Sequence, residues 1–140
     1  MARILAINSF VAQGHVGLSA MVPALQAMGH EVMAVPTVVL SNHYGYDACG
    51  GFQLSAKQLE TILSGLKSNG WLDEIDAVVS GYLAEMDQVD LLAGGVEQLA
   101  ESGRDFLYVC DPVIGDDPGG LYVQDDIAKG IRDDLITLAD

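Results

Sequence analysis

Short apolar segments alternate along the chain with longer segments whose apolar residues recur at helical spacing, and this alternation constrains the fold most. Aliphatic runs predict strands at residues 4–7, 31–40, 77–79 and 106–110. Apolar positions three and four residues apart predict helices over residues 18–28, 56–68, 87–101 and 125–138. Strands that alternate with helices form mostly parallel sheets with right-handed crossovers. The pattern therefore predicts one α/β domain over residues 1–140, a Rossmann-like three-layer α/β/α fold with helices on both faces of a mostly parallel sheet.

Several residues mark where these elements begin, end or become irregular. Ser55 is expected to cap the helix that follows it, and Gly29 to end the helix before it. Pro36 lies inside a predicted strand and indicates an edge or an irregularity, because proline cannot donate to a sheet ladder. Residues 41–54 form a polar, glycine-bearing connection that is long enough to indicate a functional loop.

The charge balance excludes some classes of partner. The 140 residues carry 20 acidic and 6 basic side chains, a formal net charge of -14. Binding to nucleic acid or to an anionic membrane needs a basic face, so neither partner is expected. A phosphate ligand would have to be held locally, by backbone N–H groups and a metal ion. A plainer interpretation is equally open for most of the carboxylates, namely that they only keep the protein in solution.

Neither the cysteines nor the apolar runs indicate an extracellular or membrane protein. Cys49 and Cys110 are too few for a disulfide framework and lack the spacing of a zinc site. No apolar run approaches the roughly 20 residues that span a bilayer, and residues 1–7 do not form a signal peptide. The sequence therefore predicts a cytoplasmic protein with no membrane partner.

Four segments are expected to meet at one edge of the sheet. They follow the four predicted strands and comprise residues 8–9, 41–46, 81–82 and 111–116. The carboxyl ends of parallel strands lie together, and ligands of such sheets bind in the crevice beyond them. The topology alone therefore predicts a ligand site built from these segments.

The last of these segments carries two carboxylates. Asp111 leaves an apolar strand, Pro112 continues the chain in an extended path, and Gly115 permits a turn that brings Asp116 back toward Asp111. Two carboxylates at the mouth of a buried strand are costly unless a positive group shares them, and a hard cation such as Mg²⁺ or K⁺ suits them. The alternative is that both acids only cap the following turns; the pairing and the topology favour the cation site.

Residues 41–46 are unusually polar and aromatic for a connection, and such a segment can stack on a flat ring and hydrogen-bond its substituents. Taken alone, His43 is better explained as an ordinary loop histidine. Tyr82 is equally well explained as a lid over a ligand or as a surface aromatic residue. Gly14 and Gly17 do not form a dinucleotide fingerprint or a Walker A pattern.

Together these segments resemble the pyridoxal kinase family of the ribokinase-like superfamily, over essentially the whole chain and in the expected order. The resemblance is carried by Ile7-Asn8-Ser9-Phe10-Val11 with Gly14-His15-Val16-Gly17, by Leu40-Ser41-Asn42-His43-Tyr44-Gly45-Tyr46, by Ser80-Gly81-Tyr82, and by Val109-Cys110-Asp111-Pro112-Val113-Ile114-Gly115-Asp116. The Ser-Asn-His segment and the Cys-Asp-Pro-Val segment are each fairly specific, and their combination is strong.

The resemblance implies ATP-dependent phosphorylation of the 5′-hydroxymethyl group of pyridoxal, pyridoxine and pyridoxamine, with Mg²⁺, and with or without K⁺, as the cation. It assigns the vitamer to Ser9, Val16, His43, Tyr44 and Tyr82, the nucleotide to Asp111, Asp116 and Tyr122, and the metal to Asp111 and Asp116. Within these sets Ser9 would bond the pyridine ring, Val16 would pack on it and Tyr82 would cover it. Tyr122 lies in a flap-like segment over the nucleotide. The family also implies a homodimer.

The chain departs from the family pattern at two positions and in its length. Phe10 stands where the family commonly has histidine, and Tyr44 where it usually has a threonine. The larger Tyr44 side chain would narrow the pocket or shift the preference among vitamers. Family members are about twice as long. The later glycine-rich motif, which supplies the anion hole and the catalytic base, has no counterpart here, so no residue of this chain is assigned as catalytic. The chain is thus expected to be the N-terminal half of a kinase, inactive alone and complemented by a C-terminal half.

Two alternatives remain open from the sequence. One is a short, non-catalytic binding or regulatory module derived from such a kinase. The other is a sister kinase of the same superfamily that acts on hydroxymethylpyrimidine or on a sugar. Residues 41–46 favour the pyridoxal kinase interpretation over the sister kinase.

Overall fold

The computed structural model describes residues 1–140 and shows a five-stranded sheet in the order β3-β2-β1-β4-β5. The strands span Arg3–Val11 (β1), Glu31–Leu40 (β2), Gly51–Gln53 (β3), Ala77–Ser80 (β4) and Leu107–Cys110 (β5). Strand β1 is parallel to β2 and β4, β4 is parallel to β5, and only β3 runs antiparallel, against β2. The predicted mostly parallel sheet is confirmed.

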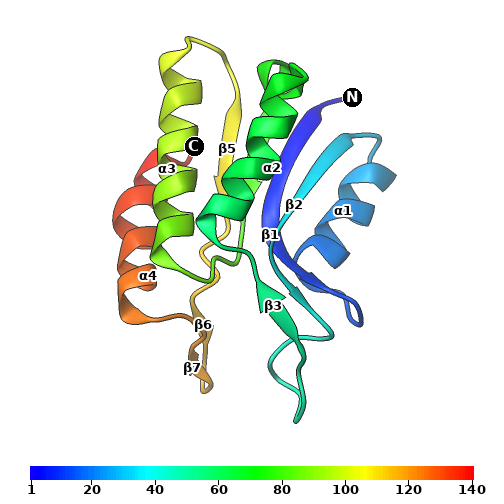
Figure 1. Cartoon of the computed structure of the whole chain (residues 1–140), viewed down its shortest axis with the longest axis vertical. Helices are drawn as coiled ribbons and strands as arrows, with labels where there is room; N and C mark the ends of the chain where they lie inside the picture. The colour runs from blue at the N-terminus through cyan, green and yellow to red at the C-terminus, as the bar shows by residue number, and fades with distance from the viewer.

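Helices cover both faces of this sheet, as predicted. They span Leu18–Ala27 (α1), Ala56–Ser68 (α2), Met86–Glu101 (α3) and Asp125–Gly130 (α4). Side chains of a strand alternate between its faces, and Leu5 and Ile7 of β1 belong to the main buried cluster with residues of α2, α3 and α4. Ile4 and Ala6 are buried on the opposite face, where α1 packs on β1 and β2. Figure 1 shows α2, α3 and α4 on one side of β1 and α1 on the other.

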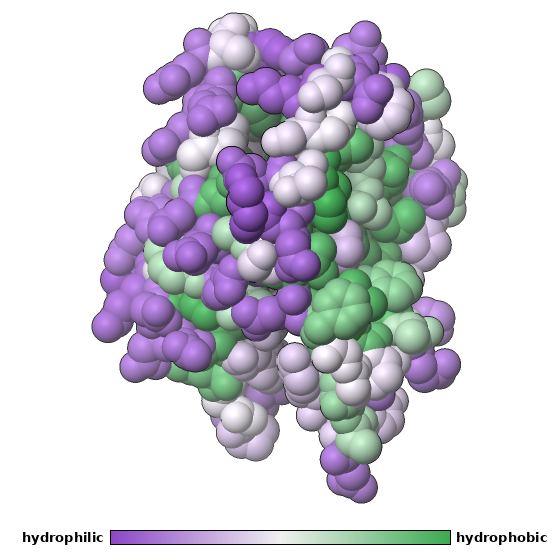
Figure 2. Space-filling view, viewed as in Figure 1, coloured by the Kyte–Doolittle hydropathy of each residue, from purple (hydrophilic) through white to green (hydrophobic).

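The surface reflects this layering. Figure 2 shows hydrophilic side chains gathered over α3 and α4, and hydrophobic side chains concentrated on the side of β2 and β3. On β5, Tyr108 is buried in the main cluster, while its neighbours Leu107 and Val109 point to the other face and are about half exposed. Helix α1 therefore shields the β1 and β2 part of that face and leaves the β5 part open.

None of the helices combines the length and the apolar character needed to span a membrane.

Strand β1 is longer than predicted and carries an irregularity beside the predicted site. It continues through Asn8 and Ser9 to Val11, where the sequence predicted a loop from residue 8. Its register with β2 shifts between Asn8, which is opposite Pro36, and Phe10, which is opposite Val39, so β2 has one extra residue there. The irregularity predicted from Pro36 is confirmed. Such an irregularity bends the strand and increases its local twist while the two strands remain paired.

Three other features differ from the sequence predictions. The loop predicted over residues 41–54 contains β3, too short to give a sequence pattern. A two-stranded hairpin, Gly115–Asp116 (β6) with Gly120–Leu121 (β7), follows β5. The last helix, predicted as continuous, is α-helical only to Gly130 and then becomes a π-helical turn, Ile131–Leu135, and a 3-10 turn, Ile136–Leu138.

The remaining local predictions are confirmed. The Ser55 side chain accepts a hydrogen bond from the Gln58 backbone N–H, and the Gln58 side chain accepts one from Ser55 N–H, which makes a capping box at the start of α2. Gly29 follows the end of α1 with a φ of 86°, a conformation that glycine adopts without strain. Helix α3 continues through Gly94 and Gly95.

Candidate functional site

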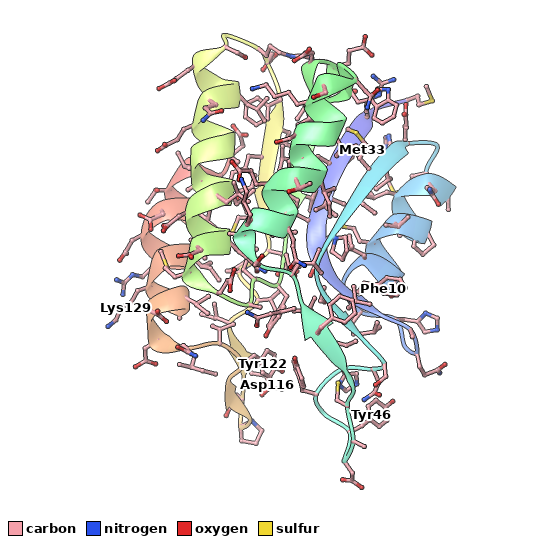
Figure 3. The ribbon with its side chains drawn as sticks, in the orientation of Figure 1. Phe10, Met33, Tyr46, Asp116, Tyr122 and Lys129 are labelled. Atoms are coloured by element: carbon pink, nitrogen blue, oxygen red, sulfur yellow. The ribbon has the colours of Figure 1, made fainter.

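A cavity of about 1040 Å³ lies at the carboxyl ends of β1, β2, β4 and β5. All eight site residues predicted from the sequence line it: Ser9, Val16, His43, Tyr44, Tyr82, Asp111, Asp116 and Tyr122. The loop after β2 and the β6–β7 hairpin project from this same end of the sheet (Figure 1). Figure 3 places Tyr46 on that loop and Asp116 with Tyr122 on the hairpin. The parallel topology therefore brings the four predicted segments together; the binding roles of the eight residues remain predictions.

One end of the cavity is built on a buried hydrogen-bond network. Asn8 is only 4% exposed, and its Oδ1 accepts hydrogen bonds from the backbone N–H of Ser9, at 2.8 Å, and of Tyr82, at 2.9 Å. The Tyr82 carbonyl in turn accepts a hydrogen bond from Thr37 Oγ1 at 2.7 Å. Both backbone groups of Tyr82 are therefore held by side chains of β1 and β2. Burial raises the pKa of the Tyr82 phenol, and the nearby Tyr44 raises it further.

Gln88 extends this network into the helical layer. Its side chain is 1% exposed; Nε2 donates to the carbonyl oxygens of Thr37 and Leu54, and Oε1 accepts from the Ala84 backbone N–H. A buried polar side chain is tolerated when its donors and acceptors are paired. The network therefore fixes the start of α3 and the segment after β4 relative to β2.

Two glycines allow close approach at this end. A side chain at Gly17, whose φ is 54°, would overlap the Ser9 carbonyl and hydroxyl. A side chain at Gly81 would overlap the Asn8 amide. Glycine is required where backbone must approach so closely. As a result, both segments pack closely on the end of β1, the start of α1 against Ser9 and the segment after β4 against Asn8.

The loop between β2 and β3 is closed by its own polar groups. Asn42 Nδ2 donates to the carbonyl oxygens of His43 and Ala48, and the Gly50 N–H donates to Ser41 Oγ. His43 Nδ1 accepts from the Gly45 N–H at 3.0 Å, which leaves Nε2 for a ligand. Tyr44 remains 63% exposed at the cavity rim. The loop thus presents aromatic groups from a self-supported turn.

The opposite end of the cavity is acidic and exposed. Asp111 follows β5, where its N–H donates to the Ser80 carbonyl. Asp116 lies in β6 and Tyr122 follows β7; all three residues are exposed. Interaction with the nearby Asp116 carboxylate is the main cause that raises the pKa of the Tyr122 phenol, and the two residues lie close together in Figure 3. The hairpin thus places a phenol beside one of the two predicted cation ligands.

The chain contains no group of three or more His, Cys, Asp or Glu side chains placed to hold a metal ion. Asp111 and Asp116 offer two carboxylates at one cavity, a donor set that suits a hard cation such as Mg²⁺, which usually keeps several waters and binds one or two carboxylates and substrate phosphates. These residues therefore fit part of a cation's coordination, with phosphate oxygens or water completing it.

Sequence reasoning missed several residues that line the cavity. Met21, Leu40 and Gly119 are among them, and Asn8 lies in the predicted segment 8–9 but was given no role of its own. Asn8 had a readable signal, since a polar residue directly after an apolar strand run must find partners once the strand is buried. Met21 was read only as part of the apolar stripe of its helix, and nothing in the sequence indicated that this helix faces the cavity.

The fold and the cavity define a class of protein, an α/β domain with a small-molecule site at the carboxyl edge of a mostly parallel sheet. No family model matches the chain. It is 41% identical over 138 residues to the pyridoxal kinase PdxY of Corynebacterium diphtheriae. The match covers 99% of this chain and 49% of that protein. The chain belongs to the pyridoxal kinase family.

Solved structures show the same similarity. The pyridoxal kinase of Leishmania donovani, in complex with ADP and pyridoxamine, superposes with a TM-score of 0.92 at 36% identity, over 100% of this chain and 48% of that one. A Bacteroides thetaiotaomicron protein assigned provisionally as a phosphomethylpyrimidine kinase superposes with a TM-score of 0.85 at 33% identity, over 99% of this chain and 46% of that one. The chain spans about half the length of the relatives it matches.

Proposed function

We propose that this chain forms the vitamer-binding part and the phosphate-facing acidic part of a pyridoxal kinase. The reaction is transfer of the γ-phosphoryl group of ATP to the 5′-hydroxymethyl group of pyridoxal, pyridoxine or pyridoxamine. The single observation that carries the proposal is that one cavity joins the aromatic and apolar residues of β1, α1 and residues 41–46 to the two carboxylates after β5. A flat ring suits the first set of residues, and a cation with phosphates suits the second.

The size of the cavity supports two ligands side by side. Small-molecule sites occupy about 300–1,000 Å³, and this cavity, at about 1040 Å³, is at the upper end. Phosphoryl transfer depends on holding the acceptor hydroxyl in line with the terminal phosphate. A ring held near Ser9 and Tyr82 would direct its hydroxymethyl group along the cavity toward Asp111 and Asp116. Mg²⁺, with or without K⁺, would there neutralise charge on the transferred phosphate.

No residue of the chain is assigned as the catalytic base. Asp111 and Asp116 belong to the cation and nucleotide side, and the attacking hydroxyl needs a separate group to accept its proton. The proposed activity is therefore that of the whole kinase, with the base and the anion hole supplied by a C-terminal half. A homodimer and a cytoplasmic location are part of the same proposal, because the family resemblance implies the first and the sequence indicates the second.

Binding and turnover by the 140-residue chain test the proposal together. We expect the chain to bind pyridoxal, measured by the absorbance change of the vitamer, and to form no ADP from ATP and pyridoxal. Protein expressed from a coding sequence extended to the length of the relatives should form ADP only when a vitamer is present. A 140-residue chain that phosphorylates pyridoxal would contradict the assignment of the base to another part of the protein.

The likeness to the Bacteroides protein favours one competing function, phosphorylation of a hydroxymethylpyrimidine. Competition separates the two candidates. If the protein is a pyridoxal kinase, 4-amino-5-hydroxymethyl-2-methylpyrimidine will displace pyridoxal only at much higher concentration than pyridoxine does. The reverse order would establish the pyrimidine kinase instead, and binding without turnover in the extended protein would indicate a non-catalytic module.

A further inference from the structure

Asn8 is the most deeply buried polar side chain that lines the cavity, and neither the sequence pattern nor the family resemblance assigned it a role. It lies near the end of β1 with 4% of its surface exposed. Burying an amide without hydrogen-bond partners is costly, so both Oδ1 and Nδ2 of Asn8 are expected to have a partner in the protein or in a ligand.

Its orientation is fixed by two backbone donors. The N–H groups of Ser9 and Tyr82 both point at the same terminal atom, at 2.8 Å and 2.9 Å. An N–H group can donate to an amide oxygen and not to an amide NH₂ group. The atom that faces them is therefore Oδ1, and the opposite terminal atom is the donor Nδ2.

Nδ2 donates to no group of the protein, since the hydrogen bonds of the Asn8 side chain all end on Oδ1. Yet no fully buried side-chain nitrogen or oxygen in the chain lacks a partner. The two facts agree only if Nδ2 keeps some exposed surface. Gly81 packs against this nitrogen, and the open space that Asn8 lines is the cavity. The amide therefore has an unpaired donor at the cavity wall.

The donor is also immobile. Gly81 packs so closely on the Asn8 amide that a side chain there would overlap it, and the two bonds to Oδ1 prevent the amide from turning over. A donor held in place before the ligand arrives adds affinity, because little conformational freedom is lost on binding.

We propose that Asn8 Nδ2 donates a hydrogen bond to an acceptor on the ring of the bound vitamer, either its ring nitrogen or its 3-oxygen. The inference rests on the proposed function for the identity of the ligand. Ser9 Oγ lies 3.5 Å from Asn8 Oδ1 and both residues line the cavity, so the two side chains would contact adjacent polar positions of the same ring. The oxygen of the Asn8 amide holds the site together, and its nitrogen contacts the ligand.

Asn8→Asp separates these two roles. The variant has the same shape and keeps an oxygen that accepts from Ser9 and Tyr82, but it replaces the NH₂ donor with an acceptor. We expect pyridoxal to bind about tenfold to a hundredfold more weakly, the loss expected when a hydrogen-bonded donor is removed from a polar ligand. Thr37→Val is the matched control, because it removes a bond to the Tyr82 backbone and leaves the Asn8 donor in place.

Ring analogues identify the acceptor. If the 3-oxygen is the partner, parent and Asn8→Asp protein should bind a 3-deoxy vitamer with similar affinity. If the ring nitrogen is the partner, the difference should vanish instead with the benzene analogue of pyridoxine. A purely structural role for Asn8 would weaken every analogue by the same factor in both Asn8→Asp and Thr37→Val, and that result would overturn the proposal.

The unliganded protein gives an independent measurement. The side-chain NH₂ of Asn8, identified in an amide NMR spectrum by its loss in Asn8→Asp, should exchange with water rapidly and shift when pyridoxal is added. Slow exchange would show that Nδ2 is bonded inside the protein and would refute the proposal. A parent protein that binds no vitamer would instead refute the proposed function, whereas equal binding by parent and Asn8→Asp would refute only the role of Asn8.

Discussion

The two ends of the cavity are built in different ways. The ring end is the end near Ser9 and Tyr82, where the vitamer ring is proposed to bind. Its backbone is held by a connected set of hydrogen bonds from three almost fully buried side chains, those of Asn8, Thr37 and Gln88. At the acidic end, Asp111 and Asp116 are exposed, and Asp116 lies in a two-residue strand of a short hairpin. One end is part of the core, and the other is a surface feature attached to it.

This contrast suits two ligands of different kinds. A flat ring is recognised by shape and by a few fixed hydrogen bonds, which a rigid frame supplies. A cation with phosphates brings its own charge and its own ligands, so exposed carboxylates on a hairpin can serve it. Substitutions at the ring end should therefore cost stability as well as binding, and substitutions at the acidic end should cost binding alone.

The largest effect is expected from Gly81→Ala. Its new methyl group would overlap the buried Asn8 amide, so the segment after β4 would have to move away from β1. We expect the free energy of unfolding to fall by about 2–3 kcal/mol, as for other overpacked sites, and pyridoxal binding to be lost. Urea unfolding followed by circular dichroism measures the first, and titration with the vitamer measures the second.

Gly94→Ala provides the matched control. Gly94 lies inside α3, and nothing lies within 4 Å of a methyl group built there. Alanine should stabilise the helix by up to about 1 kcal/mol. If Gly81→Ala unfolds at the same urea concentration as the parent or a higher one, as Gly94→Ala is expected to do, the close packing of Gly81 on Asn8 is wrong.

A test of the buried core beneath the cavity uses Tyr108 of β5, which shares a buried hydrogen bond of 2.9 Å with Ser80. Burial raises the pKa of the Tyr108 phenol above its usual value. The unfolded chain loses this proton near pH 10 while the folded chain keeps it, so the contribution of Tyr108 to stability is present below about pH 10 and falls above it. Tyr108→Phe should cost about 1–2 kcal/mol at pH 7 and should remove this part of the alkaline decline.

The measurement is the unfolding free energy of both proteins at pH 7 and at several values above pH 10. Tyr46→Phe, a change at an exposed tyrosine, serves as the control for the loss of a hydroxyl group. Parallel curves for the parent and Tyr108→Phe above pH 10 would contradict a buried, neutral Tyr108.

The sequence predicted the layers of the fold and the edge where the site lies, because strand and helix periodicities are strong over long segments. It did not predict that β1 continues through Asn8 and Ser9, since polar residues at that point look like a loop unless their buried partners are known. Strand β3 was also missed, because three residues carry no periodicity. The eight predicted site residues do line one cavity. Asn8 lies in the predicted segment 8–9 but was given no role of its own, because its importance depends on Gly81 and Tyr82, which are distant in sequence.

At the acidic end, Asp116→Asn should leave stability unchanged and weaken ATP binding in the presence of Mg²⁺ by about tenfold, because one carboxylate ligand is lost. The same change removes the carboxylate that raises the pKa of Tyr122, so this phenol should ionise at lower pH. Nucleotide titration and ultraviolet absorbance against pH measure the two effects. Chelation of Mg²⁺ should weaken nucleotide binding in the parent and have little further effect in the variant. Undiminished binding by Asp116→Asn would remove Asp116 from the cation site.

The smallest effect is expected from Tyr44→Thr, at the rim between the two ends. Tyr44 is 63% exposed and belongs to a self-supported loop, so the free energy of unfolding should change by less than about 0.5 kcal/mol. A smaller side chain widens the ring end, so affinities for pyridoxal, pyridoxine and pyridoxamine should shift relative to one another by about twofold to fivefold, the scale of a single peripheral contact. Tyr46→Phe is the control in the same loop. If Tyr44→Thr lowered stability as much as Gly81→Ala, the rim would belong to the rigid frame, and the division of the cavity into a core end and a surface end would fail.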